Sequence, residues 1–156
     1  MRSGHVAHSE ITLAIIKPDA VEQKVIGNII SLIESNGLTI RAMKMVHLTA
    51  GEAREFYAVH TGKSFFDGLV NFMSGGPSVV MVLEGEHAVA TWRNLMGPTD
   101  PQNAPEGSIR RSFGTDVRHN ATHGSDSADA AVSEIAYFFS GLDQSHLSPS
   151  REESGR

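Results

Sequence analysis

Two short apolar runs, residues 11–16 and 78–83, constrain most strongly what this chain can fold into. The first is rich in β-branched residues and is closed by Pro18, and the second follows a glycine-proline turn at 75–77. Runs of this length and composition predict strands, and the uninterrupted apolar character of 78–83 predicts a strand covered on both faces. The fold therefore needs other elements on both sides of a sheet.

Helices are predicted where apolar positions recur at helical spacing. From Val25 onward they recur until Asn36 and Gly37, which favour a left-handed helix stop. Thr49 is an expected N-cap for a helix that runs through Tyr57. Further helices are expected at 64–73, 87–96 and 128–135, and a long proline- and glycine-rich loop at 97–107.

Two more strands complete the predicted order. Residues 38–48 alternate between apolar and polar with one shift of phase, and we assign the apolar run 136–139 to the fourth strand. The resulting order is strand, helix, strand, strand, helix, strand. It predicts an α+β fold, a ferredoxin-like sandwich whose four-stranded antiparallel sheet is covered by helices, with inserted helices and a long loop.

The length of 156 residues is that of one ordinary domain, which we assign to residues 10–140. Residues 1–9 and the polar residues 141–156 are expected to be flexible extensions, because they offer few large apolar groups to bury. His5 and His8 are interpreted as terminal sequence rather than as metal ligands.

Charge and cysteine content exclude several classes of function. A formal net charge of -5 argues against nucleic-acid binding through a broad basic face. The absence of cysteine excludes disulfides and thiolate chemistry, and it fits a reducing compartment. The N-terminus lacks an apolar secretion signal, and no stretch approaches the roughly 20 apolar residues of a membrane span. We expect a cytoplasmic protein that binds neither membranes nor specific nucleic-acid sequences.

His123 stands in a segment that suits a nucleophilic imidazole. Gly124 removes bulk beside the ring, Ser125 and Asp126 can cap the following helix, and Glu134 lies further along that helix. A neutral imidazole attacks through one nitrogen when the other donates to an acceptor that fixes the tautomer. Glu134 is the candidate acceptor, with Ser125 bridging to it.

Two cations, Lys17 and Arg110, indicate an anionic substrate. Lys17 closes a buried apolar strand just before a proline, where the sheet meets solvent and functional sites are common. A histidine combined with such cations suggests phosphoryl transfer, because that reaction depends on fixed donors that stabilise the charge of the migrating group.

Two other patterns resemble known sites but lack a required part. The tripeptide 62–64 looks like the end of a phosphate-binding P-loop, yet Tyr57 stands where the first glycine is required. His119 and His123 have the spacing of a zinc pair on a helix, but Asn120 replaces the glutamate of the metalloprotease motif. We therefore predict neither a P-loop nor a zinc site from these patterns.

The segment 120–126 resembles the signature of the nucleoside diphosphate kinases, Asn-x-x-His-Gly-Ser-Asp, which is intact here. The resemblance spans residues 11–139 and consists of separate blocks in the family's order: 16–20, 56–57, 65–66, 76–77, 95–101, 108–110 and 134–135. The chain departs from many relatives at Glu106, Ser108 and Gly75, and none of these positions is assigned to chemistry. The first lies in a loop that helps pack subunits in this family.

The resemblance implies a ping-pong enzyme with broad base and sugar tolerance. A nucleoside triphosphate gives its γ-phosphoryl group to His123, and a nucleoside diphosphate takes it from the phosphohistidine. Mg²⁺ is the implied cofactor, held mainly by nucleotide phosphates, and the implied assembly is a homo-oligomer, hexameric or tetrameric. The alternative is a catalytically silent nucleotide-binding regulatory relative, against which the intact histidine argues.

Matching by position implies the remaining site residues. Ser125 and Glu134 join His123 in the catalytic group. A hydroxyl near the imidazole falls on Tyr57, base stacking falls on Phe65, and the lip of the cleft falls on Leu69. The implied phosphate contacts are Lys17, Arg93, Thr99, Arg110 and Asn120.

Overall fold

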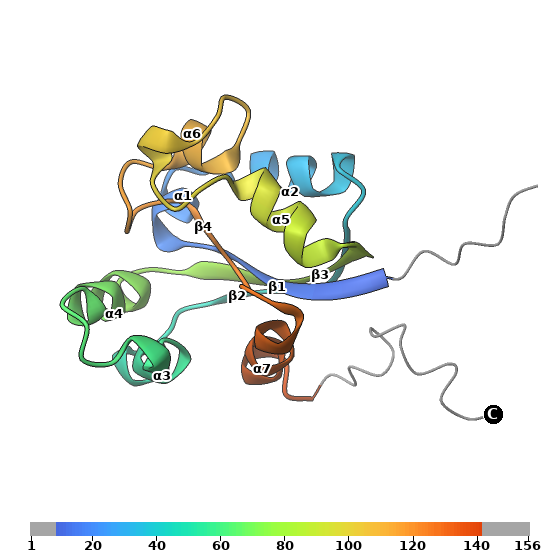
Figure 1. Cartoon of the computed structure of the whole chain (residues 1–156). Coiled ribbons are helices and arrows are strands. Elements are labelled where there is room, and N and C mark those ends of the chain that lie inside the picture. Colours follow the sequence, from blue (N-terminus) through green and yellow to red (C-terminus); the bar gives the residue numbers. More distant parts are fainter. Residues whose placement is uncertain (1–8, 142–156) are drawn as a thin grey trace, which may run out of the picture.

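A computed structural model describes residues 9–141, in which a four-stranded sheet has the order β2-β3-β1-β4 (Figure 1). All three pairings are antiparallel. This is the predicted ferredoxin-like α+β sandwich. Apart from Ser9 and Gly141, the expected flexible extensions lie outside the described residues, as do His5 and His8. The strands are β1 (Ser9–Ile16), β2 (Thr39–Val46), β3 (Ser78–Glu86) and β4 (Thr122–Gly124).

The helices of the described residues form two layers around this sheet. Thr49 caps α3 through a capping box with Glu52, as expected from the sequence. No helix within 9–141 combines the length and the apolar character needed to cross a membrane. The α-helices are α1 (Pro18–Glu22), α2 (Ile26–Ser35), α3 (Ala50–Phe56), α4 (Phe66–Ser74), α5 (Ala88–Met96), α6 (Ile109–Phe113) and α7 (Ala128–Phe138), and the 3-10 helices are η1 (Ala58–His60) and η2 (Pro101–Asn103).

The central strands β1 and β3 are buried on both faces, which confirms the prediction for 78–83. Leu13 and Ile15 pack in one core with residues of α3, α4 and α7, whereas Ala14 and Ile16 pack in a second core with residues of α2 and α5. Figure 1 shows these two groups of helices on opposite faces of the sheet. Successive side chains of a strand alternate between faces, so an unbroken apolar run serves both cores.

The fourth strand is not where the sequence analysis placed it. Residues 136–138 continue α7, and the fourth strand is the three-residue β4. Ala131, Ile135 and Phe138 are buried at helical spacing on one face of α7. A short apolar run fits a strand or a buried helix equally well. Here Phe138 continues the helical spacing of the buried residues in the preceding turns of α7, so the run is helical.

The edge strand β2 carries an irregularity that explains its shifted pattern. Its register with β3 shifts between Ile40 and Ala42, which marks a β-bulge. Beyond the bulge, Met43 and Met45 are exposed by 52% and 59%. An apolar surface therefore lies on the outer strand of the sheet.

Candidate active site

Pairing of β1 with β4 brings the two most distant parts of the site together. Ile15 pairs with His123 and Ile16 with Thr122, so Lys17 at the end of β1 meets the residues just before β4. The Lys17 backbone N–H donates to the Ala121 carbonyl at 2.8 Å, and its Nζ donates to Asn120 Oδ1 at 2.8 Å. An edge strand of the sheet therefore carries His123 beside a buried cation.

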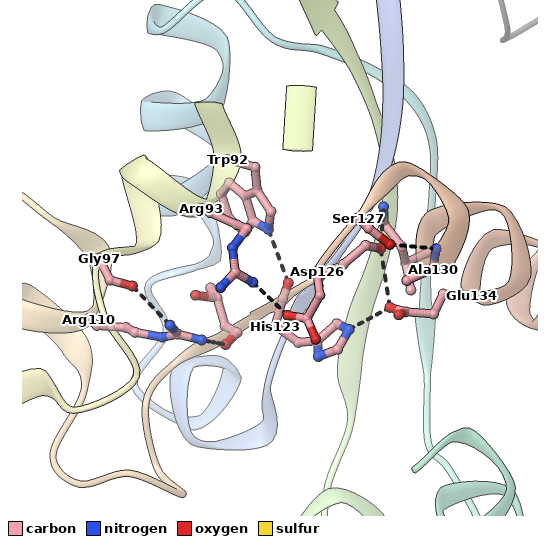
Figure 2. A network of polar contacts seen from close by, with 12 residues as sticks. Trp92, Arg93, Gly97, Arg110, His123, Asp126, Ser127, Ala130 and Glu134 are labelled. Carbon is pink, nitrogen blue, oxygen red and sulfur yellow. Dashed lines mark hydrogen bonds and ion pairs between the residues drawn. The ribbon is translucent and has the colours of Figure 1, made fainter. Parts of the chain in front are cut away.

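The His123 imidazole is oriented through one of its two nitrogens. His123 Nε2 lies 2.6 Å from Glu134 Oε1, and Ser125 Oγ donates to the same oxygen at 3.2 Å. Figure 2 shows the ring turned toward Glu134 of α7. A carboxylate only accepts, so in the neutral ring the contact with Glu134 favours the tautomer with the proton on Nε2 and the lone pair on Nδ1. The predicted partnership of Glu134 and Ser125 with His123 is present in the geometry.

Two aromatic rings lie against the imidazole. Phe56 and Tyr57 meet it edge-on, with ring centroids 5.3 Å and 6.0 Å from that of His123. Within residues 9–141 the buried Tyr57 hydroxyl has no hydrogen-bond partner. Burial, and then the charge of Glu134, raise the pKa of Tyr57 far above its ordinary value. The phenol keeps its proton and remains an unused donor near the imidazole.

Lys17 and Arg110 are largely removed from solvent, and their burial disfavours the charged form of each side chain. Burial, and then the charge of Arg110, lower the pKa of Lys17 to about 8, although Asp19 acts in the opposite direction. Burial, and then Arg93, lower the pKa of Arg110 to about 10. Arg110 donates to the carbonyls of Gly97 and Thr122, each at 2.9 Å (Figure 2). Two poorly hydrated cations with few countercharges form a site for an anion.

Asn120 ties three segments of the site together. Its Oδ1 accepts from Lys17, and its Nδ2 donates to the carbonyls of Thr99 at 3.0 Å and Val117 at 3.2 Å. The long loop is thereby joined to the segment before β4, and Thr99 is placed near the buried cations. The exposed side chain of Thr99 faces solvent in this arrangement.

The other predicted binding residues lie further out. Phe65 immediately precedes α4 and is 42% exposed, and Leu69 follows one turn later, half-buried. Arg93 of α5 pairs with Asp126 across a Nη1–Oδ1 distance of 2.8 Å, with both side chains exposed (Figure 2). These residues are more exposed than Lys17 and Asn120 of the inner group.

Two details of the segment after His123 differ from the sequence analysis. Ser127, not Ser125 or Asp126, caps α7, because its Oγ accepts from the Ala130 N–H at 3.1 Å. Gly124 does clear space, but for α5: a Cβ there would lie 2.7 Å from the Trp92 ring. The Trp92 Nε1 in turn donates to the His123 carbonyl at 3.1 Å (Figure 2).

The residues of the two patterns set aside in the sequence lie in loops and on β4. Lys63 lies in the turn before α4 and contacts His60 Nδ1 at 3.1 Å, so 62–64 does not follow a strand. His119 Nδ1 lies 3.0 Å from Asp116, while His123 is on β4. Across residues 9–141, no three His, Asp or Glu side chains are grouped as they would be around a metal ion.

Comparison with known proteins decides the family. The family model "Nucleoside diphosphate kinase" matches residues 10–143. The nucleoside diphosphate kinase of Hydrogenovibrio crunogenus is 54% identical over 134 residues, which cover 86% of this chain and 95% of that protein. The chain belongs to the nucleoside diphosphate kinase family. Family members are phosphotransferases, so the chain is an enzyme of this class.

Solved structures of other nucleoside diphosphate kinases share this fold. The Aquifex aeolicus enzyme has a TM-score of 0.84 at 47% identity, covering 86% of this chain and 97% of that one. The Halobacterium salinarum enzyme in complex with CDP has a TM-score of 0.82 at 45% identity, covering 85% and 88%. The predicted α+β architecture is confirmed by both.

Three residues that contact the predicted site residues or their neighbours were given no role in the site from the sequence. Asp19 accepts from the Ala121 N–H at 3.0 Å, Asp126 pairs with Arg93, and His60 packs between Tyr57 and Phe65. Burial and the charge of Lys63 lower the pKa of His60. Asp19 and Asp126 lie inside the matched blocks 16–20 and 120–126, and this membership was the sequence signal that could have identified them. His60 lies in no such block.

Proposed function

We propose that this enzyme carries a phosphoryl group between nucleotides on Nδ1 of His123. The observation that carries the proposal is the 2.6 Å contact of Nε2 with Glu134, which leaves Nδ1 with a lone pair. The Nδ1 lone pair attacks the γ-phosphorus of a nucleoside triphosphate. The bond from that phosphorus to the bridging oxygen breaks, and the nucleoside diphosphate leaves with the electron pair. A second diphosphate then attacks the phosphohistidine through a terminal β-phosphate oxygen and restores the neutral ring.

Glu134 and the buried cations have separate roles in this proposal. Phosphorylation makes the imidazole cationic, and the carboxylate of Glu134 beside Nε2 stabilises that charge while Ser125 holds the carboxylate. Lys17, Arg110 and Asn120 bind the charged oxygens of the migrating and leaving groups, with Thr99 and Arg93 further along the polyphosphate. The Tyr57 hydroxyl supplies a donor near the reacting nitrogen.

Nucleotide binding on the outer residues follows the same proposal. Phe65 stacks on the base and Leu69 packs beside it, which gives broad base tolerance because every base has a π-face. The CDP complex of the Halobacterium salinarum relative supports a nucleotide in this fold. Mg²⁺ would be held by phosphate oxygens, since the inner side chains are cations and amides, and it would neutralise phosphate charge when bound.

The quaternary and cellular parts of the proposal rest on fewer observations. We propose a homo-oligomer, hexameric or tetrameric, and the exposed methionines 43 and 45 on edge strand β2 support a contact between copies. Analytical ultracentrifugation tests this directly. We also propose a cytoplasmic location, which the lack of cysteine supports, and cell fractionation tests it.

The decisive experiment uses γ-labelled ATP with Mg²⁺. The wild-type protein should form an acid-labile phosphoprotein that loses its label to added GDP. His123→Ala should form none while still binding ATP, and the matched His119→Ala should label normally. Label that persists in His123→Ala, or no label in the wild type, would overturn the proposal, and the second result would favour a silent nucleotide-binding protein.

A further inference from the structure

Ala121 has a backbone conformation that alanine rarely adopts. Its φ is 73°, in the left-handed region, and it stands between Asn120 and Thr122 just ahead of His123. Non-glycine residues are uncommon there, and such strain persists only where the surrounding structure enforces it. The buried segment that presents the nucleophile therefore depends on contacts that hold Ala121 in place.

Those contacts come from one short segment at the end of β1. The Asp19 Oδ2 accepts from the Ala121 N–H at 3.0 Å, and the Lys17 N–H donates to the Ala121 carbonyl at 2.8 Å. Both polar backbone groups of the strained residue are thus bonded to residues 17–19. The same segment carries the Lys17 ammonium, which bonds Asn120. One clamp joins the cation to the residues preceding the histidine.

The burial of the Asp19 carboxylate is difficult to explain by fold stability alone. Its other oxygen, Oδ1, is buried without a hydrogen-bond partner among residues 9–141. Burial raises the pKa of the Asp19 carboxyl above its ordinary value, although the N–H groups of residues 19–20 and 121 and the charge of Lys17 act in the opposite direction. A partly desolvated carboxylate with one unbonded oxygen destabilises a fold, and such features concentrate at functional sites.

We propose that Asp19 is a positioning residue: its carboxylate locks Ala121 in the left-handed conformation and so fixes His123 in register with Lys17. This rests on the proposed function of His123. Asp19 touches neither reacting atom, and acts through the backbone of Ala121 and through the field at Lys17. Because a displacement of about 1 Å can cost about 10²-fold in rate, the lock contributes to transfer rather than to nucleotide binding.

The first test compares two variants in single-turnover labelling with ATP and Mg²⁺. Asp19→Asn keeps an oxygen to accept from Ala121 but loses the charge, whereas Asp19→Ala loses both. Asp19→Ala should lower the labelling rate about 100-fold with little change in KM, and Asp19→Asn should recover most of that loss. The control is Asp129→Asn, an exposed first-turn carboxylate of α7, which should behave as wild type.

The second test asks whether Asp19 acts through the strain at Ala121. Glycine adopts a positive φ without penalty, so Ala121→Gly should make the segment less dependent on the clamp. The loss caused by Asp19→Ala should therefore be at least tenfold smaller in an Ala121→Gly background. An equal loss in both backgrounds would overturn the proposal, and this comparison remains valid if the single variants differ in stability.

The third readout is the pH profile of kcat/KM for Asp19→Asn. Arg110 and Asp19 are the charged groups that act on Lys17, and Asp19 favours its protonated form. Without that charge Lys17 should deprotonate at lower pH, so the alkaline limb should move to lower pH. An unmoved limb in Asp19→Asn, together with wild-type labelling by Asp19→Ala, would overturn the role of Asp19. Failure of the wild type to label would instead overturn the function of His123.

Discussion

The inner and outer parts of the site differ in how much they are fixed before a nucleotide arrives. The inner residues Lys17 and Asn120 are only 7% and 2% exposed and bond each other, whereas Phe65 is 42% exposed outside them. The buried cations have lowered pKa values, and the outer Arg93 is paired with an exposed carboxylate. Fixed, poorly hydrated donors act strongly on a transition state, while solvated groups contribute mainly to binding.

The largest expected effect comes from removing the inner cation Lys17, and the comparison is with removal of the outer cation Arg93. Lys17→Met should lower kcat/KM by about 10²–10³, the usual value of a preorganised donor, with the fall mainly in kcat. Arg93→Met should cost about tenfold or less, because an exposed charge is screened by solvent. Steady-state kinetics with ATP and a diphosphate acceptor measure both. Equal losses would remove the distinction between the inner and outer groups.

A second test separates charge from hydrogen bonding on the inner side. Glu134→Gln keeps an oxygen that accepts from Nε2. It loses the charge that, in the proposed mechanism, stabilises the phosphorylated imidazole. The labelling rate should fall about 10–100-fold without being abolished. Val132→Ala, two residues away and 52% exposed on α7, is a control for helix perturbation. An unchanged labelling rate would exclude Glu134 from the mechanism.

Much of the inner site could be predicted from the sequence because it lies in contiguous motifs. The motif around His123 names the histidine, Asn120 and Ser125 together, and the geometry brings them to Lys17 and Glu134. The pairing of β1 with β4 was not predicted. A three-residue strand with no apolar pattern gives no periodic signal, so the fourth strand was placed in α7 instead.

Long-range backbone contacts were the second thing the sequence could not supply. Asp19 and Ala121 are separated by 102 positions, and their bond depends on a left-handed alanine that no propensity favours. His60 belongs to none of the matched blocks, and only its ring contacts with Tyr57 and Phe65 place it here. Local sequence patterns identify the candidate reactive residues, but the contacts that orient those residues are tertiary contacts between distant segments.

The pH dependence offers a third test of the inner group. The lowered pKa of about 8 means that Lys17 is charged below that pH and neutral above it. Activity that needs the charged form should therefore fall as pH rises through about 8, by about tenfold for each further unit. A profile of kcat/KM reports this ionisation in the free enzyme. A profile flat to pH 10 would mean that the ammonium is better solvated than its burial implies.

The smallest expected effect lies on the outer side, at Phe65. Phe65→Ala should raise KM about fivefold, the lower end of what base stacking contributes, because the ring is partly exposed. The value of kcat should stay nearly constant, since stacking is equally strong in the ground and transition states. Measuring purine and pyrimidine diphosphates side by side adds a sharper criterion. Stacking distinguishes no base edge, so the increase should be of similar size for both. A loss confined to one class of base would contradict simple stacking on Phe65. A fall in kcat comparable to that of Lys17→Met would mean that the outer residues take part in the transfer step, and the distinction between the inner and outer groups would then be wrong.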